Sequence, residues 1–343
     1  MKPIIGITMG DPASIGPEIS VKALYHEDLY DRAKPIIIGD ACVMERAARI
    51  LGMDDSKIHR VKSVDEARFV PGTRDVLDLG LVNADQLMYG KVSALAGEAA
   101  FQYVIMAIDL AERRIVDATV TNALSKEAIH LAGHHYSGHT EIYAEYTGTR
   151  HYTMMLAHET LRVVHVSTHV SLREACERVK KTRVLEVIRI AHDACRRLGI
   201  AEPRIGVAGL NPHSGENGLF GREEIDEIIP AIAEAREEGM TVDGPVPPDT
   251  VFSKAIGGWY DIVVTMYHDQ GHIPVKVKGF VYDAAHRKWQ AVAGVNITLG
   301  LPIIRTSVDH GTAFDQVGSG QANELSLLNA IDYAVRMAQG QNR

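Results

Sequence analysis

The sequence predicts an α/β fold, in which the strands of a parallel sheet alternate with the helices that cover it. Apolar runs at 3–7, 35–39 and 261–264 have the length and composition of buried strands. A pattern at 95–116, with apolar residues recurring near helical spacing, is typical of a buried helix. Strands and helices that alternate along a chain in this way are typical of an α/β sheet.

Length and composition restrict the class of protein. The chain has 343 residues, of which 46% are hydrophobic, and a formal net charge of −8 at pH 7. A chain of this size can bury a substantial core, divided between two lobes. The acidic balance argues against a nucleic-acid-binding face, which needs clustered basic residues. Cys42, Cys176 and Cys195 form no C-x-x-C pair, so we expect neither a disulfide framework nor a thiolate metal site.

The N-terminal strand begins without a signal-peptide pattern, and we expect no apolar run that approaches the length of a membrane span. These observations predict a cytoplasmic protein with no membrane partner.

A turn rich in glycine and proline at 9–18 connects the first strand to a helical pattern that begins at Ile19. The turn is not a G-x-G-x-x-G nucleotide fingerprint. Pro17 suits the first turn of a helix, and Gly16 permits the close approach of another backbone. The turn is therefore either a loop that faces a ligand or a tight connection between strand and helix.

Three predicted strands end in the same way, each followed within a few residues by a histidine. The strands are expected at 161–168, 204–210 and 261–264, and the histidines are His169, His213 and His268. If the strands belong to one parallel sheet, their ends lie along one edge, and three imidazoles can converge on a divalent ion. A single histidine after a strand is ordinarily a cap, so it is the repetition that favours a metal site.

Two further segments carry polar groups that suit a binding site. His139 and Thr140 lie between Gly138 and a helix expected from Glu141, so the free N–H groups of that helix and both side chains could hold an anionic substrate. The alternative is that Thr140 simply caps the helix. Asp249 lies in a rigid loop at 244–250 and is either catalytic or the cap of a turn.

The rest of the chain continues the alternation. A capping-box pattern at 171–174 starts a helix that runs toward Leu198, and another helix is expected at 223–238. Residues 279–294 are expected to form a hairpin or an exposed flap, and a last helix is expected at 324–338.

Several blocks of sequence together resemble the 4-hydroxythreonine-4-phosphate dehydrogenase family, over nearly the full chain. Residues 309–323 also resemble the nucleotide-binding loop of the metal-dependent β-decarboxylating dehydrogenases that act on isocitrate and isopropylmalate. The family-specific blocks are Gly-Asp-Pro at 10–12, Ser-Gly-His-Thr-Glu at 137–141, Leu-Asn-Pro-His-Ser-Gly-Glu at 210–216, Met-Tyr-His-Asp-Gln-Gly at 266–271, Val-Asn-Ile-Thr-Leu-Gly-Leu-Pro at 295–302 and Arg-Thr-Ser-Val-Asp-His-Gly-Thr at 305–312.

The resemblance implies a two-lobed fold of the isocitrate and isopropylmalate dehydrogenase type, with the active site in the cleft between the lobes. The first lobe is expected at 1–136 plus 294–343, with the nucleotide loop. The second lobe is expected at 137–293, with the metal histidines and the dimer interface. The family is dimeric, which implies a homodimer with its active site at the subunit interface.

The resemblance also implies roles for single residues. Matching positions give His169, His213 and His268 as ligands of zinc, magnesium or cobalt. The matched substrate contacts are His139, Thr140, Lys276, Asn296 and Arg305. The matched nucleotide-loop positions are His310, Ala313, Asp315 and Asn323. A carboxylate at Asp315 favours NAD, because it accepts a hydrogen bond from the ribose 2′-hydroxyl and would repel a 2′-phosphate. Either Lys276 or Asp249 is expected to shuttle the proton, and the plainer alternative for Lys276 and Arg305 is a surface salt bridge.

The implied reaction is oxidation of the C3 hydroxyl of a phosphorylated four-carbon acid by NAD, followed by loss of CO₂. Ser14, Ala123 and a longer segment at 281–293 depart from the biosynthetic enzymes, and His272 resembles the catabolic relatives. The expected substrates are therefore 4-phospho-D-threonate or 4-phospho-D-erythronate, giving dihydroxyacetone phosphate. The alternative is 4-hydroxy-L-threonine 4-phosphate, an intermediate of pyridoxal phosphate synthesis.

Two other classes of protein fit part of the pattern. Three histidines with Asp249 or Asp269 could activate water in a metal-dependent phosphohydrolase. A catalytically silent sugar-phosphate binding protein could use the same groups without turnover. The phosphohydrolase leaves the pattern of Asp315 and Asn323 unexplained.

Overall fold

The computed structural model describes residues 1–284 and 288–341 and divides the chain into two compact units. Unit 1 comprises Met1–Arg150 and Leu301–Gln339, and unit 2 comprises His151–Gly300 with the end of the chain from Gly340. The boundaries between the units therefore lie later in the chain, after Arg150 and after Gly300, than the positions 137 and 294 expected from the sequence. Residues 137–150 stay with unit 1 because α6 (His139–Tyr146) packs on α4 (Ala94–Glu112).

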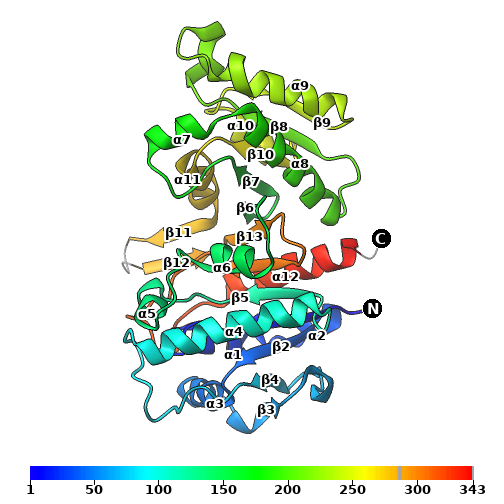
Figure 1. The fold of residues 1–343 in the computed structure, drawn as a ribbon. Coiled ribbons are helices and arrows are strands. Elements are labelled where there is room, and N and C mark those ends of the chain that lie inside the picture. Colours follow the sequence, from blue (N-terminus) through cyan, green and yellow to red (C-terminus); the bar gives the residue numbers. More distant parts are fainter. Residues whose placement is uncertain (285–287, 342–343) are drawn as a thin grey trace. The chain divides into compact units, whose positions relative to one another are not determined.

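Unit 1 is built on parallel strands (Figure 1). Their apolar side chains are buried. The neighbours in the sheet pair in parallel, and the register aligns Ile7 with Ile37 on one side and with Val120 on the other. All three of these side chains are 0% exposed, as expected for a sheet covered on both faces. The strand order is β3 (Ile58–Val61), β4 (Arg74–Asp78), β2 (Lys34–Gly39), β1 (Ile4–Thr8), β5 (Ala118–Thr121) and β14 (Arg305–Val308).

The helices of unit 1 follow its strands in the expected alternation. They are α1 (Gly16–Ala23), α2 (Leu29–Arg32), α3 (Ala41–Ile50), α4, α5 (Lys126–Leu131), α6 and most of α12 (Leu325–Gln341), with short 3₁₀ turns at Asp55–Lys57 and Val64–Glu66. The helix predicted at 95–116 is α4, and the N-terminal turn leads into α1 as expected.

Helix α4 corrects one expectation. Its 19 residues have a mean hydropathy of 1.3, so by length and composition it is apolar enough to cross a membrane. Within the described residues, 61% of this stretch is buried in the protein. Gly97 lets α4 approach α5 closely, because a Cβ there would lie 2.0 Å from the carbonyl oxygen of Ala128. The apolar composition of α4 therefore serves helix packing.

Unit 2 is built on a mixed sheet. Its antiparallel part is β13 (Val295–Leu299), β6 (Thr153–His158) and β7 (Leu161–His165), and its parallel part continues from β7 through β10 (Ile262–Thr265) and β8 (Arg204–Ala208) to β9 (Thr241–Val246). Pairing of β13 with β6 explains why residues 294–300 belong to unit 2.

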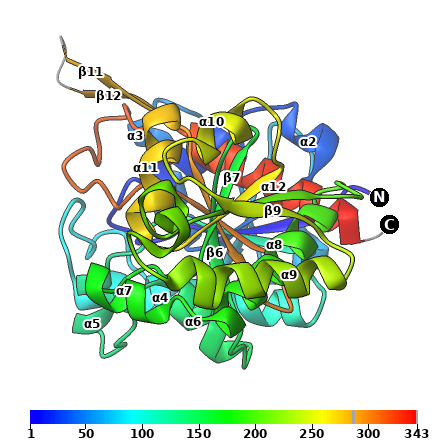
Figure 2. The ribbon, with the colours of Figure 1, turned by 90° about the horizontal axis from the view of Figure 1, so that it is seen from above.

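The helical elements of unit 2 are α7 (Leu172–Arg178), α8 (Lys181–Arg197), η3 (Pro212–Gly218), η4 (Glu224–Ile228), α9 (Ile229–Glu237), α10 (Val251–Ile256) and α11 (His268–Gly279). Figures 1 and 2 show α8 beside α9. Ser171 caps the start of α7 as expected, since its side chain accepts from the N–H of Glu174 at 3.2 Å.

The single helix expected from this cap toward Leu198 is wrong. Val179 and Lys180 leave the helical conformation, with ψ of 89° and 142°, and they separate α7 from α8. Val179 is 0% exposed, so the break buries a side chain that a continuous helix would place differently. The flap expected at 279–294 is a hairpin of β11 (Phe280–Asp283) and β12 (Lys288–Val292), which forms an arm beyond α11 (Figure 2).

Candidate active site

The three histidine-bearing strands are neighbours in the parallel part of the sheet, so their adjacency is as predicted. β10 lies between β7 and β8, and Val263 aligns with Val163 on one side and with Gly206 on the other. The carboxyl ends of all three strands therefore meet at one edge, which is where ligands gather in open α/β sheets. A histidine follows each strand at this edge. His169 follows β7, His213 lies in the turn η3 after β8, and His268 is in the first turn of α11 after β10.

The structure brings together two of the three predicted metal ligands. The rings of His169 and His268 lie 5.8 Å apart, and His268 is oriented by its Nδ1, which lies 2.7 Å from Oδ1 of Asp269. His213 is exposed, and its ring lies 6.3 Å from that of Phe220. Among the residues that the structure describes, no group of three metal-binding side chains is assembled. The donors fit a divalent ion in type and in strand position, but His213 stands outside the pair.

The turn that carries His213 has an unusual backbone. His213, Ser214, Glu216 and Asn217 all have φ between 44° and 54°, the left-handed region that costs about 1 kcal/mol or more for each side-chain-bearing residue. Glu224, 1% exposed, supports the turn, because Oε1 accepts from the N–H groups of Leu210 and Asn211, each at 2.7 Å. A strained segment held by its surroundings is a common property of functional sites.

A buried pair of histidines lies behind His268. His165 is 0% exposed, and His272 stacks on His268 with ring centroids 3.6 Å apart. Nδ1 of His165 lies 3.2 Å from the Met154 carbonyl oxygen, and its Nε2 lies 3.1 Å from Nδ1 of His272. Burial lowers the pKa of His165 to about 4 and that of His272 to about 3, so both are neutral near pH 7.

In this neutral state the hydrogen bonds select one tautomer for each ring. His165 donates from Nδ1 to the carbonyl oxygen of Met154, and His272 donates from Nδ1, which lies 3.0 Å from the carbonyl oxygen of His268 and 3.1 Å from Nε2 of His165. The pair therefore holds the ring against which His268 stacks.

The remaining predicted residues of unit 2 lie on different elements. Lys276 is in α11, eight positions after His268, and its Nζ lies 5.0 Å from the centre of the Phe280 ring. Asp249 is exposed in the turn before α10. Asn296 is on β13, where Nδ2 lies 2.8 Å from Sδ of Met154 and Oδ1 is buried without a hydrogen-bond partner. Of these three residues, only Lys276 shares an element with a predicted metal ligand, His268.

In unit 1, the charge of the buried Arg305 guanidinium acts on the nearby imidazole of His139. Arg305 is 2% exposed, so the alternative of a surface salt bridge is wrong for it. Its Nη2 donates to Thr121 Oγ1 at 2.7 Å, and its guanidinium lies 5.7 Å from the ring centre of Tyr143. Burial lowers the pKa of Arg305 to about 10, so the guanidinium is charged at neutral pH.

His139 is the first residue of α6, and its Nε2 is buried without a hydrogen-bond partner. Burial, and then the nearby charge of Arg305, hold the pKa of His139 well below its usual range. The N-cap of α6 is Gly138, so Thr140 is not the cap, and the alternative interpretation of that residue is wrong. A neutral imidazole and a charged guanidinium at a helix N-terminus form an environment that suits an anion.

The four nucleotide-loop residues lie between β14 and α12. Ala313 has φ of 44°, and Asp315 and Asn323 are exposed. Burial lowers the pKa of His310, whose Nδ1 lies 2.9 Å from the carbonyl oxygen of Gly311 and whose Nε2 is buried without a partner. The loop presents a carboxylate and an amide on its surface, the groups expected to face a nucleotide.

The N-terminal turn lies beside this loop. The N–H of Ile15 donates to the Thr312 carbonyl at 3.3 Å, and Gly16 approaches Met9, whose carbonyl oxygen would be 2.2 Å from an added Cβ. Asp11 is 0% exposed; its Oδ1 accepts from Ala13 N–H at 2.8 Å, whereas Oδ2 is buried without a partner. Burial raises the pKa of Asp11 to about 6.

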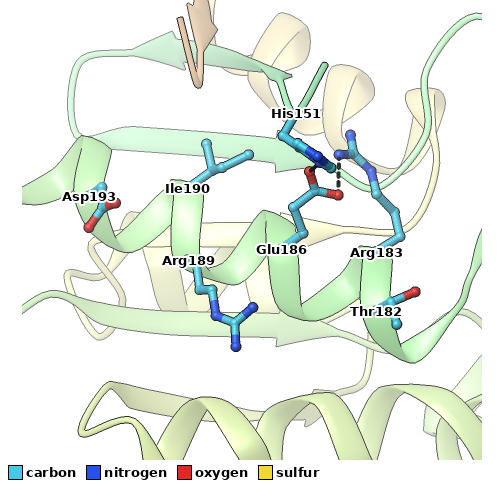
Figure 3. Close-up of a pocket in the computed structure, with 7 residues that line it drawn as sticks. All are labelled: His151, Thr182, Arg183, Glu186, Arg189, Ile190 and Asp193. Carbon is cyan, nitrogen blue, oxygen red and sulfur yellow. Dashed lines mark hydrogen bonds and ion pairs between the residues drawn. The ribbon is translucent and has the colours of Figure 1, made fainter. Parts of the chain in front are cut away.

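A separate surface pocket lies along α8 and has a cavity volume of about 530 Å³ (Figure 3). Nδ1 of His151 lies 2.5 Å from Oε1 of Glu186, and Arg183 donates to Oε2 of the same carboxylate at 3.0 Å. The central charges of this pocket neutralise one another, and it contains none of the predicted site residues. We assign no chemistry to it.

Known proteins resemble this chain over almost its whole length. The model of the family described as "Pyridoxal phosphate biosynthetic protein PdxA" matches residues 31–334. The chain belongs to this family. A D-threonate 4-phosphate dehydrogenase from Cupriavidus necator is 49% identical over 337 residues, which cover 98% of this chain and 97% of that protein. A second enzyme of that name, from Salmonella typhimurium, is 49% identical over 334 residues, covering 97% and 98%.

Solved structures agree with this placement. A 4-hydroxythreonine-4-phosphate dehydrogenase from Klebsiella pneumoniae has a TM-score of 0.86 at 44% identity, over 98% of this chain and 100% of that one. The predicted α/β fold, of the isocitrate and isopropylmalate dehydrogenase type, is thus confirmed for this PdxA-family protein.

Sequence reasoning missed several residues that contact the predicted site residues within each unit of this PdxA-family chain. Tyr143, Thr121 and His165 were not predicted, and His272 was noted only for its likeness to catabolic relatives. The spacing of four between His268 and His272, and between His139 and Tyr143, places each pair on one helix face and was an available signal. Thr121 and His165 had no such signal, because they belong to strands whose neighbours are distant in sequence.

The titration of Asp11 predicts how stability depends on pH. Because its pKa is raised on folding, the native protein holds a proton that the unfolded chain releases as the pH rises above about 4. The wild-type free energy of unfolding should therefore lose a contribution as the pH rises toward 6, and Asp11→Asn should abolish that loss. Denaturant titrations should show the variant gaining about 2 kcal/mol on wild type between about pH 4 and about pH 7.

The matched control is Asp65→Asn, which changes an exposed carboxylate in the same unit. Its curve should run parallel to wild type. A parallel curve for Asp11→Asn would contradict the prediction.

Proposed function

We propose that this chain is a dehydrogenase that oxidises the C3 hydroxyl of 4-phospho-D-threonate or 4-phospho-D-erythronate with NAD and a divalent metal ion. The resulting β-keto acid loses CO₂ and gives dihydroxyacetone phosphate. The observation that carries the proposal is the alignment of three histidine-bearing strands at one sheet edge, in a chain 49% identical to enzymes named D-threonate 4-phosphate dehydrogenase.

His169, His213 and His268 are the proposed ligands of the metal, which is zinc, magnesium or cobalt. Such an ion, when bound, lowers the pKa of a hydroxyl group and polarises the carbonyl that replaces it. Neutral imidazole is a common ligand for these ions, and Asp269 and the His165–His272 pair orient His268 for this role. Ligation by His213 requires the Pro212–Gly218 turn to bring its ring toward the other two.

Arg305, His139 and Thr140 are proposed to bind the anionic groups of the substrate. The substrate carries a phosphate and a carboxylate, and a buried guanidinium binds such groups strongly because little water competes for it. Thr121 fixes the guanidinium by accepting from Nη2 at 2.7 Å. The buried Oδ1 of Asn296 is proposed to accept a hydrogen bond from a substrate hydroxyl.

Lys276 is proposed to move the protons of the reaction. Oxidation at C3 releases the hydroxyl proton, and loss of CO₂ leaves an electron pair at C2 that must be protonated. Lys276 Nζ can serve both steps, since an amine accepts a proton and the resulting ammonium donates it. Asp249, exposed in its turn, is the alternative shuttle.

His310, Ala313, Asp315 and Asn323 are proposed to bind NAD. The exposed carboxylate of Asp315 is suited to accept from a ribose hydroxyl and to repel the phosphate of NADP. A cytoplasmic location is also proposed, and the three free cysteines agree with it.

The proposed partner is a second copy of the chain. α11 carries His268 and also exposes Ile273 (58%) and Val277 (78%), and the hairpin beside it exposes Val281 (48%) and Tyr282 (53%). Exposed apolar side chains on two elements in contact are typical of protein interfaces. Docking through α11 would place the partner next to His268, which agrees with an active site built at the subunit interface.

The substrate assignment predicts a definite pattern of activity. Purified protein with divalent metal and NAD should produce NADH with 4-phospho-D-threonate and 4-phospho-D-erythronate, and dihydroxyacetone phosphate should appear in equal amount. Preference for 4-hydroxy-L-threonine 4-phosphate would instead assign the chain to pyridoxal phosphate synthesis. Phosphate release without NADH would favour a hydrolase, and metal binding without turnover would contradict the substrate assignment.

The metal assignment predicts that His169→Asn, His213→Asn and His268→Asn each weaken cobalt binding by at least about tenfold, because each removes one ligand. Binding is measured by calorimetry and by the cobalt absorption spectrum, without reference to activity. His151→Asn changes a histidine of unit 2 outside the set and should bind as wild type does. Unchanged binding by His213→Asn alone would show that a group other than His213 completes the site.

The dimer assignment predicts that Val277→Glu raises the dissociation constant of the dimer by at least about tenfold, because it places a charge in an apolar interface. Sedimentation velocity over a range of concentrations measures this effect. Leu131→Glu, a similar change at an exposed leucine of unit 1 (60% exposed), is the control and should leave the dimer intact. A monomeric wild-type protein would contradict the assignment.

A further inference from the structure

Helix α1 is bonded to the loop at 310–323 through two side chains. Glu18 accepts from two backbone N–H groups of the loop, from Gly318 to Oε1 at 2.7 Å and from Gly320 to Oε2 at 3.1 Å. Lys22 donates from Nζ to two loop carbonyls, that of Gly320 at 2.7 Å and that of Ala322 at 2.6 Å. One turn of helix thus binds both the donors and the acceptors of the same short stretch of backbone.

Burial makes these contacts different from ordinary surface bonds. Glu18 is 0% exposed, and a buried carboxylate is costly unless hydrogen bonds replace the water that it has lost. The loop amides supply those bonds. Lys22 is four positions later, so it lies on the same face of α1 and contacts the next part of the loop.

The loop depends on such support because it has little structure of its own. Between β14 and α12 the described chain forms turns and bends without a helix or strand. Gly318 and Gly320 have φ of 81° and 67°, and backbone N–H groups in turns of this kind form small cavities that bind anions. The Glu18 carboxylate occupies the place of that anion.

The neighbours of α1 secure both ends of the same loop. Before the helix, the N–H of Ile15 donates to the carbonyl of Thr312 at 3.3 Å. After the helix, Nε2 of His26 lies 3.2 Å from Oε1 of Glu324. The loop that carries Asp315 and Asn323 is therefore attached at its start, middle and end to α1 and the residues on either side of this helix.

We propose that Glu18 and Lys22 are positioning residues that shape the 310–323 loop for a dinucleotide before the dinucleotide binds. This inference rests on the proposed role of the loop in NAD binding. A loop shaped in advance loses less conformational entropy when it binds a ligand, so its affinity is higher. Residues that only stabilised the fold would leave affinity for the dinucleotide unchanged.

The test uses Glu18→Gln and Lys22→Met in the full-length protein. Glu18→Gln keeps the shape but replaces a charged acceptor and turns one oxygen into a donor facing an N–H group. Both variants should raise the dissociation constant of NADH, measured by fluorescence, and the KM for NAD by at least about tenfold. The KM for the phosphorylated acid and the affinity for cobalt should stay within about twofold. Controls are Glu27→Gln and Lys57→Met, which change exposed residues of unit 1.

Hydrogen exchange separates the possible outcomes. In the absence of cofactor, the amides of Gly318 and Gly320 should exchange at least about tenfold faster in Glu18→Gln than in wild type. Faster exchange with unchanged NADH affinity would overturn the positioning role. Wild-type protein that binds no NADH would refute the proposed cofactor instead, and the exchange result would still show whether Glu18 holds the loop. If Glu18→Gln fails to fold, Lys22→Met carries the test, because Lys22 is only partly buried.

Discussion

The parallel pairing of β10 with β7 and β8 is the constraint on which the candidate metal site depends. All four residues of β10 are buried, so this strand is covered on both faces and its register is determined by its neighbours. The pairing places the ends of three strands at one edge of the sheet, so the histidines that follow these strands start from the same edge. A shift of register would separate those ends and reverse the faces of the side chains.

Unit 1 buries several ionisable side chains away from water. Arg305, Asp11 and Glu18 are each at most 2% exposed, and each has hydrogen-bond partners that replace part of its hydration. For Arg305 the result is a charged guanidinium beside a neutral imidazole, ready for an anion. For Glu18 the result is a link between a helix and a loop. Burial of this kind is costly, and it is most readily explained where the charge has a function.

Hydrogen bonding also organises the groups that the proposed reaction uses. His165 and His272 form a neutral chain that ends against His268, and Thr121 holds the guanidinium of Arg305. These partners contact the proposed ligands of metal and substrate. They therefore orient the side chains of those ligands and influence their protonation, and they do not themselves take part in the proposed reaction. The turn of His213 is the exception, because its left-handed backbone is held by Glu224 while its imidazole stands outside the pair.

The sequence by itself determined the α/β class and the strands that end in histidines. It also limited the turn before α1 to two interpretations, a loop that faces a ligand or a tight connection between strand and helix. These follow from local patterns of apolar residues, glycine and proline, which act over a few positions. It did not determine that α7 and α8 are separate helices, that α4 is long and apolar because it packs against its neighbours, or which residues His165, Thr121, Glu18 and Lys22 contact. Only the tertiary structure decided these points, because each depends on contacts between residues far apart in the chain, such as Glu18 with Gly318, which no local pattern records.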